Sequence, residues 1–165
     1  MVEYIDNFLE EHIAQLIDMQ LREVSWKYDY DSVKGGANKH WHVFLGHKVG
    51  ELGDILPIWN KIDEQFNNEM ERAYLNAHTH GIEPHIHRDD GDQTFIYYPR
   101  LDWQLEWAGG TTIFDKDKNV THHFGYKGNR IISFKASLLH QAQSISRECY
   151  HLRTCVVFKT NKDTS

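Results

Sequence analysis

Residues 72–99 read RAYLNAHTHGIEPHIHRDDGDQTFIYYP, and this stretch decides the fold. The pieces RAYLNAHTH and TFIYYP are short, contain aromatic and β-branched residues, and are separated by glycine, proline and aspartate. Short apolar pieces between such turn residues are typical of β-strands. Similar pieces follow at TTIF (111–114), RIISF (130–134) and LRTCVVFK (152–159). The sequence after residue 72 therefore predicts a mainly β core.

The number of strand-like pieces, about eight, fits a two-sheet jelly roll, here a double-stranded β-helix over about residues 72–160. Upstream, apolar residues recur at helical spacing in residues 6–23 and 54–70, which predicts two amphipathic helices. We therefore expect one domain over residues 1–165, in which a helical support region, about residues 1–71, flanks the jelly-roll core.

Composition and charge exclude some kinds of partner. The net charge of −6 disfavours nucleic acid as the main partner, because phosphate binding needs a basic surface. The sequence contains no apolar run of membrane-spanning length, and its first residues are acidic rather than signal-like. Cys149 and Cys155 lie close together on strand-like sequence, where they make a poor disulfide pair. We therefore expect a cytoplasmic protein without a membrane partner.

The stretch EPHIHRDDG, residues 83–91, concentrates side chains that bind metals. On a strand, residues two apart share a face, so that His85, His87 and Asp89 would lie on one side and Asp90 on the other. Asp89 can therefore join His87 on a metal. One further histidine would complete a 2-His-1-carboxylate triad, which suits non-haem Fe(II).

Two further residues, His140 and Arg153, lie later in the sequence and extend this pattern. His140 follows the apolar strand RIISF and is expected to face the barrel interior. Arg153 begins the apolar strand that contains TCVVF, where an unpaired charge would be costly to bury. Its partner is either a carboxylate of the protein or the carboxylate of a ligand, and the residues alone leave both readings open.

In four ordered blocks the sequence resembles the Fe(II)/2-oxoglutarate-dependent dioxygenases of the prolyl 4-hydroxylase type. The blocks are YLNAHTHGIEPHIHRDD (74–90), TFIYYPRLDWQLEWAGGTTIF (94–114), GNRIISFKASLLHQAQS (128–144) and LRTCVVF (152–158). The resemblance implies that His87, Asp89 and His140 are the metal ligands. It also implies that Arg153 and Tyr98 bind the distal carboxylate of 2-oxoglutarate.

Three further residues are candidates for the cosubstrate site. His80 stands where relatives often carry a tyrosine, and this departure leaves two readings open: a hydrogen bond to 2-oxoglutarate, or a satisfied polar group without a role in binding. Asn76 shares its strand face and is a second, weaker candidate to contact the cosubstrate. The gap between His140 and Arg153 is longer than is usual in the family, which leaves Arg147 as the alternative anchor.

The function that the resemblance implies is hydroxylation of an amino-acid side chain, in a free amino acid or within a peptide or protein, with proline as the first candidate. Its cofactors would be Fe(II), 2-oxoglutarate and O2, with ascorbate as a supporting reductant, and its products would include succinate and CO2. Two other classes stay open. One is a cupin-like hydrolase or lyase that uses Zn(II) or another divalent ion. The other is a non-catalytic jelly-roll module with a structural metal.

Overall fold

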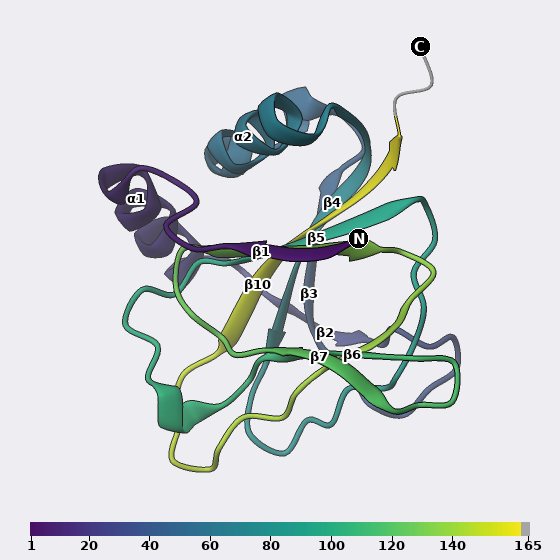
Figure 1. Ribbon diagram of the computed structural model, residues 1–165. Coiled ribbons are helices and arrows are strands. Elements are labelled where there is room, and N and C mark those ends of the chain that lie inside the picture. The colour runs from purple at the N-terminus through teal and green to yellow at the C-terminus, as the bar shows by residue number, and fades with distance from the viewer. Residues whose placement is uncertain (163–165) are drawn as a thin grey trace.

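The computed structural model describes residues 1–162, which form two antiparallel sheets that face each other, with two helices outside the larger sheet (Figure 1). The seven-stranded sheet has the strand order β1-β8-β5-β10-β4-β3-β2, and the three-stranded sheet has the order β7-β6-β9. This arrangement confirms the predicted mainly β jelly-roll class. The strands are β1 (Val2–Ile5), β2 (Lys27–Tyr30), β3 (His40–Gly46), β4 (Asn68–His78), β5 (Gln93–Tyr98), β6 (Thr111–Phe114), β7 (Val120–Phe124), β8 (Arg130–Lys135), β9 (Leu139–Ala142) and β10 (Arg153–Lys162).

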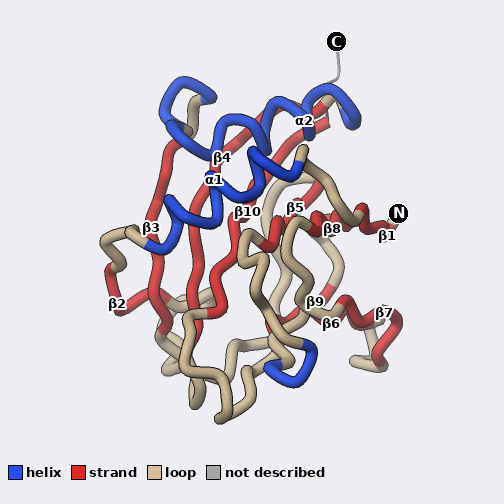
Figure 2. Tube along the Cα trace, turned by 90° about the vertical axis from the view of Figure 1, so that its left-hand side faces the viewer, coloured by secondary structure: helices blue, strands red, loops and turns tan. Residues whose placement is uncertain are grey.

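Both predicted helices form, α1 at Glu11–Arg22 and α2 at Leu56–Phe66. They lie over the same face of the large sheet (Figure 2). Their apolar sides pack with the residues of β4, β5, β8 and β10 that face away from the small sheet, and together they form one hydrophobic core. This burial, rather than helix propensity, stabilises such short helices. α2 ends where Asn67 adopts a left-handed conformation, φ 48°.

The amino-terminal part contributes more to the sheet than its helical pattern indicated. β1, β2 and β3 lie within residues 1–71, yet they occupy both edges of the seven-stranded sheet. α1 begins five residues later than predicted, because residues 2–5 pair with β8 and the chain then bends, with Asn7 at φ 52°, before the helix starts. Neither α1 nor α2, the helices of the described chain, is long and apolar enough to cross a lipid bilayer.

Asn129 holds the segment between β1 and α1 against the core. Its side-chain Oδ1 accepts hydrogen bonds from the Leu9 N–H at 2.9 Å and the Tyr97 hydroxyl at 3.1 Å, and its Nδ2 donates to the Leu9 carbonyl at 2.9 Å. Asn129 itself is buried with φ 59°, a left-handed conformation that asparagine tolerates better than most residues.

Asn129→Ala should lower the free energy of unfolding by about 2–4 kcal/mol, because it leaves buried donors and an acceptor without partners and strains the backbone. Asn129→Gly also removes the side-chain hydrogen bonds but adds no backbone strain, so its loss of unfolding free energy reports the hydrogen bonds alone. Asn119→Ala, in the exposed turn between β6 and β7, should change stability by less than about 0.5 kcal/mol. Urea denaturation measures all three. An Asn129→Gly variant as stable as the wild type would contradict this role.

Candidate metal centre and the cavity beside it

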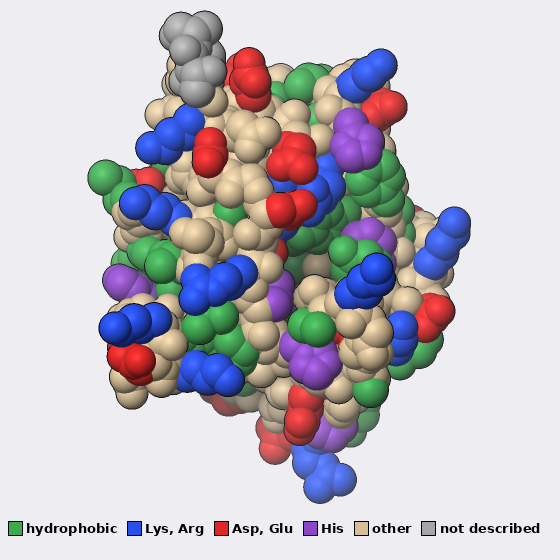
Figure 3. All heavy atoms as spheres, turned by 90° about the vertical axis from the view of Figure 1, so that its right-hand side faces the viewer, with side chains coloured by type: hydrophobic (Ala, Val, Ile, Leu, Met, Phe, Trp, Pro, Cys, Tyr) green, Lys and Arg blue, Asp and Glu red, His purple; other side chains and the backbone are tan. Residues whose placement is uncertain are grey.

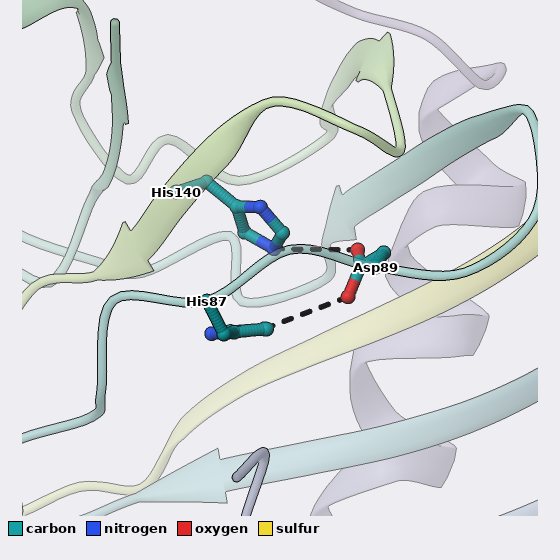
Figure 4. Close-up of side chains that lie close together, drawn as sticks. All are labelled: His87, Asp89 and His140. Atoms are coloured by element: carbon teal, nitrogen blue, oxygen red, sulfur yellow. Dashed lines mark ion pairs between the residues drawn. The ribbon is translucent and has the colours of Figure 1, made fainter. Parts of the chain in front are cut away.

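His87, Asp89 and His140 converge at one point of the barrel interior (Figure 4). Their ligand atoms all lie within 4.8 Å of one another. The Nε2 atoms of His87 and His140 lie 3.5 Å and 3.3 Å from the Asp89 carboxylate oxygens. Two polar residues that flank His87 and Asp89 in the sequence have other partners. His85 lies 3.7 Å from Asp31, and Asp90 forms an ion pair with Arg72.

The backbone brings these three side chains together in a way that differs from the expected strand. Residues 84–89 form no regular strand, and only His87 makes a β-bridge, which joins it to His140 of β9. The two residues exchange backbone hydrogen bonds of 3.0 Å and 2.9 Å, and the Asp89 N–H donates to the Ala136 carbonyl at 2.9 Å. This short pairing to the small sheet orients His87 and Asp89 toward the same interior.

The two imidazoles are prepared to act as ligands. The Nδ1 atom of His87 bonds the His85 carbonyl at 2.9 Å, and that of His140 bonds the Leu138 carbonyl at 3.0 Å. A carbonyl can only accept, so each Nδ1 carries the proton and each Nε2 directs its lone pair into the site. Burial lowers the pKa of both histidines to about 4, which keeps them neutral at pH 7. The donor set therefore fits a divalent transition metal with open coordination positions.

Thr94 and Lys159 both contact the same oxygen of the Asp89 carboxylate. The Thr94 hydroxyl donates to Asp89 Oδ2 at 2.7 Å, and the Lys159 ammonium contacts the same oxygen. Burial and the nearby Arg72 lower the pKa of Lys159 well below its usual value, and Glu71 opposes this lowering.

Arg153 lies in the same cavity, at the start of β10 and only 1 % exposed. It donates to the carbonyl oxygens of Gly109 and Gly110, the latter at 3.1 Å, and its guanidinium lies over the Tyr98 ring at 5.6 Å. Within residues 1–162 no carboxylate forms an ion pair with it. The sequence left two possible partners for Arg153, a carboxylate of the protein or that of a ligand. The first is not found among the described residues.

Two of the expected cosubstrate residues lie near Arg153. The Tyr98 hydroxyl is fully buried and lies 2.6 Å from the Thr111 hydroxyl, which is also 3.4 Å from Arg153 Nη2. Asn76 lines the cavity, where its Oδ1 accepts a 2.8 Å hydrogen bond from His42. Both positions are compatible with a carboxylate bound at Arg153, and their roles stay predictions.

The other two candidates lie apart from the cavity lining. The Nδ1 atom of His80 lies 3.3 Å from the Ile145 carbonyl oxygen, so that His80 contacts the loop of residues 145–152. Arg147 is exposed in that loop. The additional residues between His140 and Arg153 form this loop, so the long gap does not displace Arg153 from the cavity.

Sequence reasoning missed several cavity residues: Thr94, His78, Thr111 and Lys159. The alternation along β10 could have revealed Lys159, because Arg153, Cys155, Val157 and Lys159 share one strand face. A charged residue on that face of a buried strand is unexpected unless it has a partner inside the barrel. The contributions of Thr94 and Thr111 depend on contacts between strands and leave no local signal.

The buried histidines should make the metal-free protein sensitive to acid. Burial lowers the pKa of His40, His87 and His140 to about 4, whereas the unfolded chain binds these protons near pH 6.5. Since the unfolded state holds more protons in this window, stability should be complete above pH 6.5 and fall as the pH drops toward 4. We expect a loss of about 1–2 kcal/mol per histidine at pH 5, measured by urea denaturation.

His40→Phe tests this assignment without altering the triad. His40 is 1 % exposed and packs against the His78 ring with 4.8 Å between centroids, a place that a phenyl ring can fill. The variant should lose less stability than the wild type between pH 7 and pH 5. An unchanged pH dependence would show that His40 does not contribute.

Comparisons with known proteins bear on the fold. No family model and no curated protein matches the sequence. Solved structures do match. A prolyl hydroxylase from Trichoplax adhaerens, in complex with a hypoxia-inducible-factor peptide fragment, is 13% identical with TM-score 0.72, covering 97% of this chain and 83% of its own. A 2OG-Fe(II) oxygenase family oxidoreductase from Burkholderia pseudomallei is 11% identical with TM-score 0.71, covering 97% and 84%.

A third structure is the viral collagen prolyl hydroxylase of Paramecium bursaria Chlorella virus-1, in complex with 2OG. It is 16% identical with TM-score 0.67, and the match covers 95% of this chain and 93% of that one. The three similarities extend over nearly the whole chain, and the sequence identities are low enough that they speak for architecture alone. The chain has the jelly-roll fold of the prolyl hydroxylases and of the wider 2OG-Fe(II) oxygenase family.

Proposed function

We propose that this protein is an Fe(II)- and 2-oxoglutarate-dependent oxygenase that hydroxylates an amino-acid side chain. The observation that carries the proposal is the pairing of two sites in one cavity. His87, Asp89 and His140 form a neutral-imidazole and carboxylate triad, and Arg153 presents a buried guanidinium that no carboxylate of residues 1–162 neutralises. A metal ligated on one face and a dicarboxylate would satisfy both sites together.

Each side chain then has a defined task. His87 and His140 would bind Fe(II) through Nε2, held in orientation by their Nδ1 hydrogen bonds to backbone carbonyls. Asp89 would offer a carboxylate oxygen to the metal. Arg153 would bind the distal carboxylate of 2-oxoglutarate, because its planar guanidinium matches a carboxylate in a bidentate contact. Tyr98 would support this contact through Thr111.

When bound, Fe(II) and 2-oxoglutarate would supply the oxidising chemistry, in which 2-oxoglutarate and O2 are converted to succinate and CO2, with one oxygen atom going into succinate and the other into the hydroxylated substrate. The chain supplies position and a dry cavity for this chemistry. Apolar and aromatic side chains, among them Tyr74, Ile96 and Val157, line the same cavity and limit the water beside the triad.

The surface next to the cavity is suited to a substrate larger than one side chain. A groove of about 510 Å³ runs along β2 and β3, lined by Tyr28, Tyr30, His42 and Phe44. Its inner end adjoins the cavity, since His42 packs on Tyr74 with 5.2 Å between ring centroids. One face of the molecule is hollowed, with hydrophobic side chains inside and charged and histidine side chains around it (Figure 3). We propose a peptide or a free amino acid as substrate, with proline tested first; the Trichoplax neighbour holds a peptide.

The proposal is tested by succinate release from 2-oxoglutarate with Fe(II) and ascorbate, first without substrate and then with amino acids and proline-containing peptides. Mass spectrometry of the same reactions detects the gain of one oxygen atom. We expect slow succinate release alone and faster, coupled release with a substrate. Turnover that Zn(II) supports and that needs no 2-oxoglutarate would replace the proposal by a cupin-like hydrolase or lyase. Metal binding without any turnover would favour a non-catalytic module.

A further inference from the structure

The two oxygens of the Asp89 carboxylate are placed alike toward the other two members of the triad. Oδ1 lies 3.5 Å from His87 Nε2, and Oδ2 lies 3.3 Å from His140 Nε2 (Figure 4). Neither Nε2 carries a hydrogen, because each imidazole has its proton on Nδ1. The imidazoles therefore leave both oxygens free to bind a metal, and other contacts must distinguish them.

Thr94 distinguishes the two oxygens. Its hydroxyl donates to Oδ2 at 2.7 Å, and the Lys159 nitrogen contacts the same oxygen. Each carboxylate oxygen has about two lone-pair positions, so these two neighbours use those of Oδ2. For Oδ1, residues 1–162 provide no hydrogen-bond donor. Oδ1 is thus the oxygen whose lone pairs are available.

The direction of the Thr94 hydrogen bond follows from the groups around it. Lys159 Nζ lies 3.2 Å from Thr94 Oγ1 and donates to it. This holds for an ammonium and for a neutral amine alike, because both carry hydrogens. The single hydroxyl hydrogen of Thr94 is then directed to the Asp89 carboxylate, which can only accept.

The fold fixes the position of this hydroxyl. Thr94 is 1 % exposed and lies on β5, where it pairs with Lys159 of β10 on one side and with Phe134 of β8 on the other. A β-branched side chain has few χ1 conformations, so little entropy is lost when its hydroxyl is held in place. The contact between Thr94 and Asp89 is therefore formed before a metal binds.

The number of Asp89 oxygens on the metal decides how many coordination positions stay open, and this step rests on the proposed function. Two imidazoles and one carboxylate oxygen occupy one face of an octahedral metal and leave the opposite three positions open. 2-Oxoglutarate, an α-keto acid, can offer two oxygens to the metal, and O2 needs one position more. A second oxygen of Asp89 on the metal would remove that last position.

We propose that Thr94 is a positioning residue that confines Asp89 to a single metal bond, through Oδ1. By holding Oδ2 in a hydrogen bond, Thr94 prevents the carboxylate from chelating the metal and so preserves an open position. Without the hydroxyl, a lone pair of Oδ2 becomes free, and Oδ2 joins Oδ1 on the metal. Thr94 acts through Asp89 and is itself no ligand.

The test counts the water ligands of bound Mn(II), a readout independent of turnover. Mn(II) prefers octahedral coordination, and water fills the positions that the protein leaves open. The count comes from the broadening of the Mn(II) electron paramagnetic resonance lines in ¹⁷O-enriched water, with protein in excess so that all Mn(II) is bound. Thr94→Val removes the hydroxyl at nearly constant volume. We expect this variant to hold one water fewer than the wild type, both before and after 2-oxoglutarate is added.

Two further variants show whether the hydroxyl is responsible. Thr94→Ser keeps a hydroxyl at this place and should restore the wild-type count. Thr154→Val removes a hydroxyl from a threonine that is 6 % exposed on the opposite face of β10, and it should leave the count unchanged. Thermal unfolding of the Mn(II)-loaded proteins checks that each variant is folded. If Thr94→Val does not fold, Thr94→Ala replaces it, with the same loss of one water expected.

The outcomes separate this inference from the proposed function. Wild-type protein that binds neither Mn(II) nor 2-oxoglutarate would overturn the proposed function itself. If the wild type binds both, but the valine variant keeps as many waters, the role of Thr94 is wrong and the metal centre stands. The same conclusion follows if Thr94→Ser or Thr154→Val loses a water as Thr94→Val does.

Discussion

His140→Ala will abolish Fe(II)-dependent succinate release and weaken metal binding by at least about a hundredfold. Loss of a group that merely orients a ligand costs ten- to hundredfold in metal affinity, and His140 is expected to be a ligand itself. His140 directs its Nε2 toward Asp89 at 3.3 Å and is bridged to His87, so no neighbouring histidine can take its place without moving β9. Mn(II) binding, followed by electron paramagnetic resonance, measures affinity, and the succinate assay measures turnover.

The matched control is His85→Ala, two residues before His87 and paired with Asp31 rather than with the triad. This variant should bind Mn(II) nearly as tightly as the wild type. Thermal unfolding should show that His140→Ala is folded, because the loss of one ligand removes no large apolar side chain from the core. A His140→Ala protein that keeps wild-type Mn(II) affinity, or a His85→Ala protein that loses it, would show that the triad is wrongly assigned.

Arg153→Ala will weaken 2-oxoglutarate binding by between about thirtyfold and several thousandfold. Truncating one partner of a buried charged contact costs on the order of 2–5 kcal/mol, and each 1.4 kcal/mol is a factor of ten. Arg153→Lys should restore only part of the affinity, because lysine offers a point charge in place of a planar fork. Fe(II) affinity should change much less, since Arg153 is not among the expected metal ligands. Anaerobic titration, followed by the charge-transfer absorption of the Fe(II)-2-oxoglutarate complex, gives the affinity.

Arg147→Ala is the control for this measurement. Arg147 is exposed in the loop that precedes β10, and its replacement should leave 2-oxoglutarate affinity nearly unchanged. If Arg147→Ala loses the cosubstrate and Arg153→Ala retains it, the anchor has been assigned to the wrong arginine. If neither change matters, 2-oxoglutarate is not the cosubstrate.

The fold class and the pairing of His87 with Asp89 can be predicted because both leave local signals, whereas His140 was assigned as the third ligand through the resemblance to the prolyl 4-hydroxylase type. Strand-like pieces between turn residues indicate the jelly roll, and the spacing of His87 and Asp89 places them on one side. The strand interpretation of residues 84–89 was nevertheless wrong in detail, since only His87 pairs, and it pairs with the short β9. The side chains still converge because that single bridge fixes the direction of the segment.

Other features depend on partners distant in the sequence. β1 joins the large sheet by pairing with β8, more than a hundred residues later, and its four residues carry no strand signal as strong as the helical period after them. Asn129, which binds Leu9 just before α1, is also separated from its partner by 120 residues of sequence. Lys159 follows the apolar residues of its strand and resembles an ordinary charged strand end in the sequence, although the structure buries it.

The central position of β10 determines which parts of the cavity can move. β10 is hydrogen-bonded to β4 on one side and to β5 on the other, whereas β2 is an edge strand whose four residues are all exposed. Amide hydrogen exchange should therefore be slowest along β10 and fast along β2, since local opening begins where few buried contacts resist it. We therefore expect the β10 wall of the cavity to stay fixed and the β2 edge to open first.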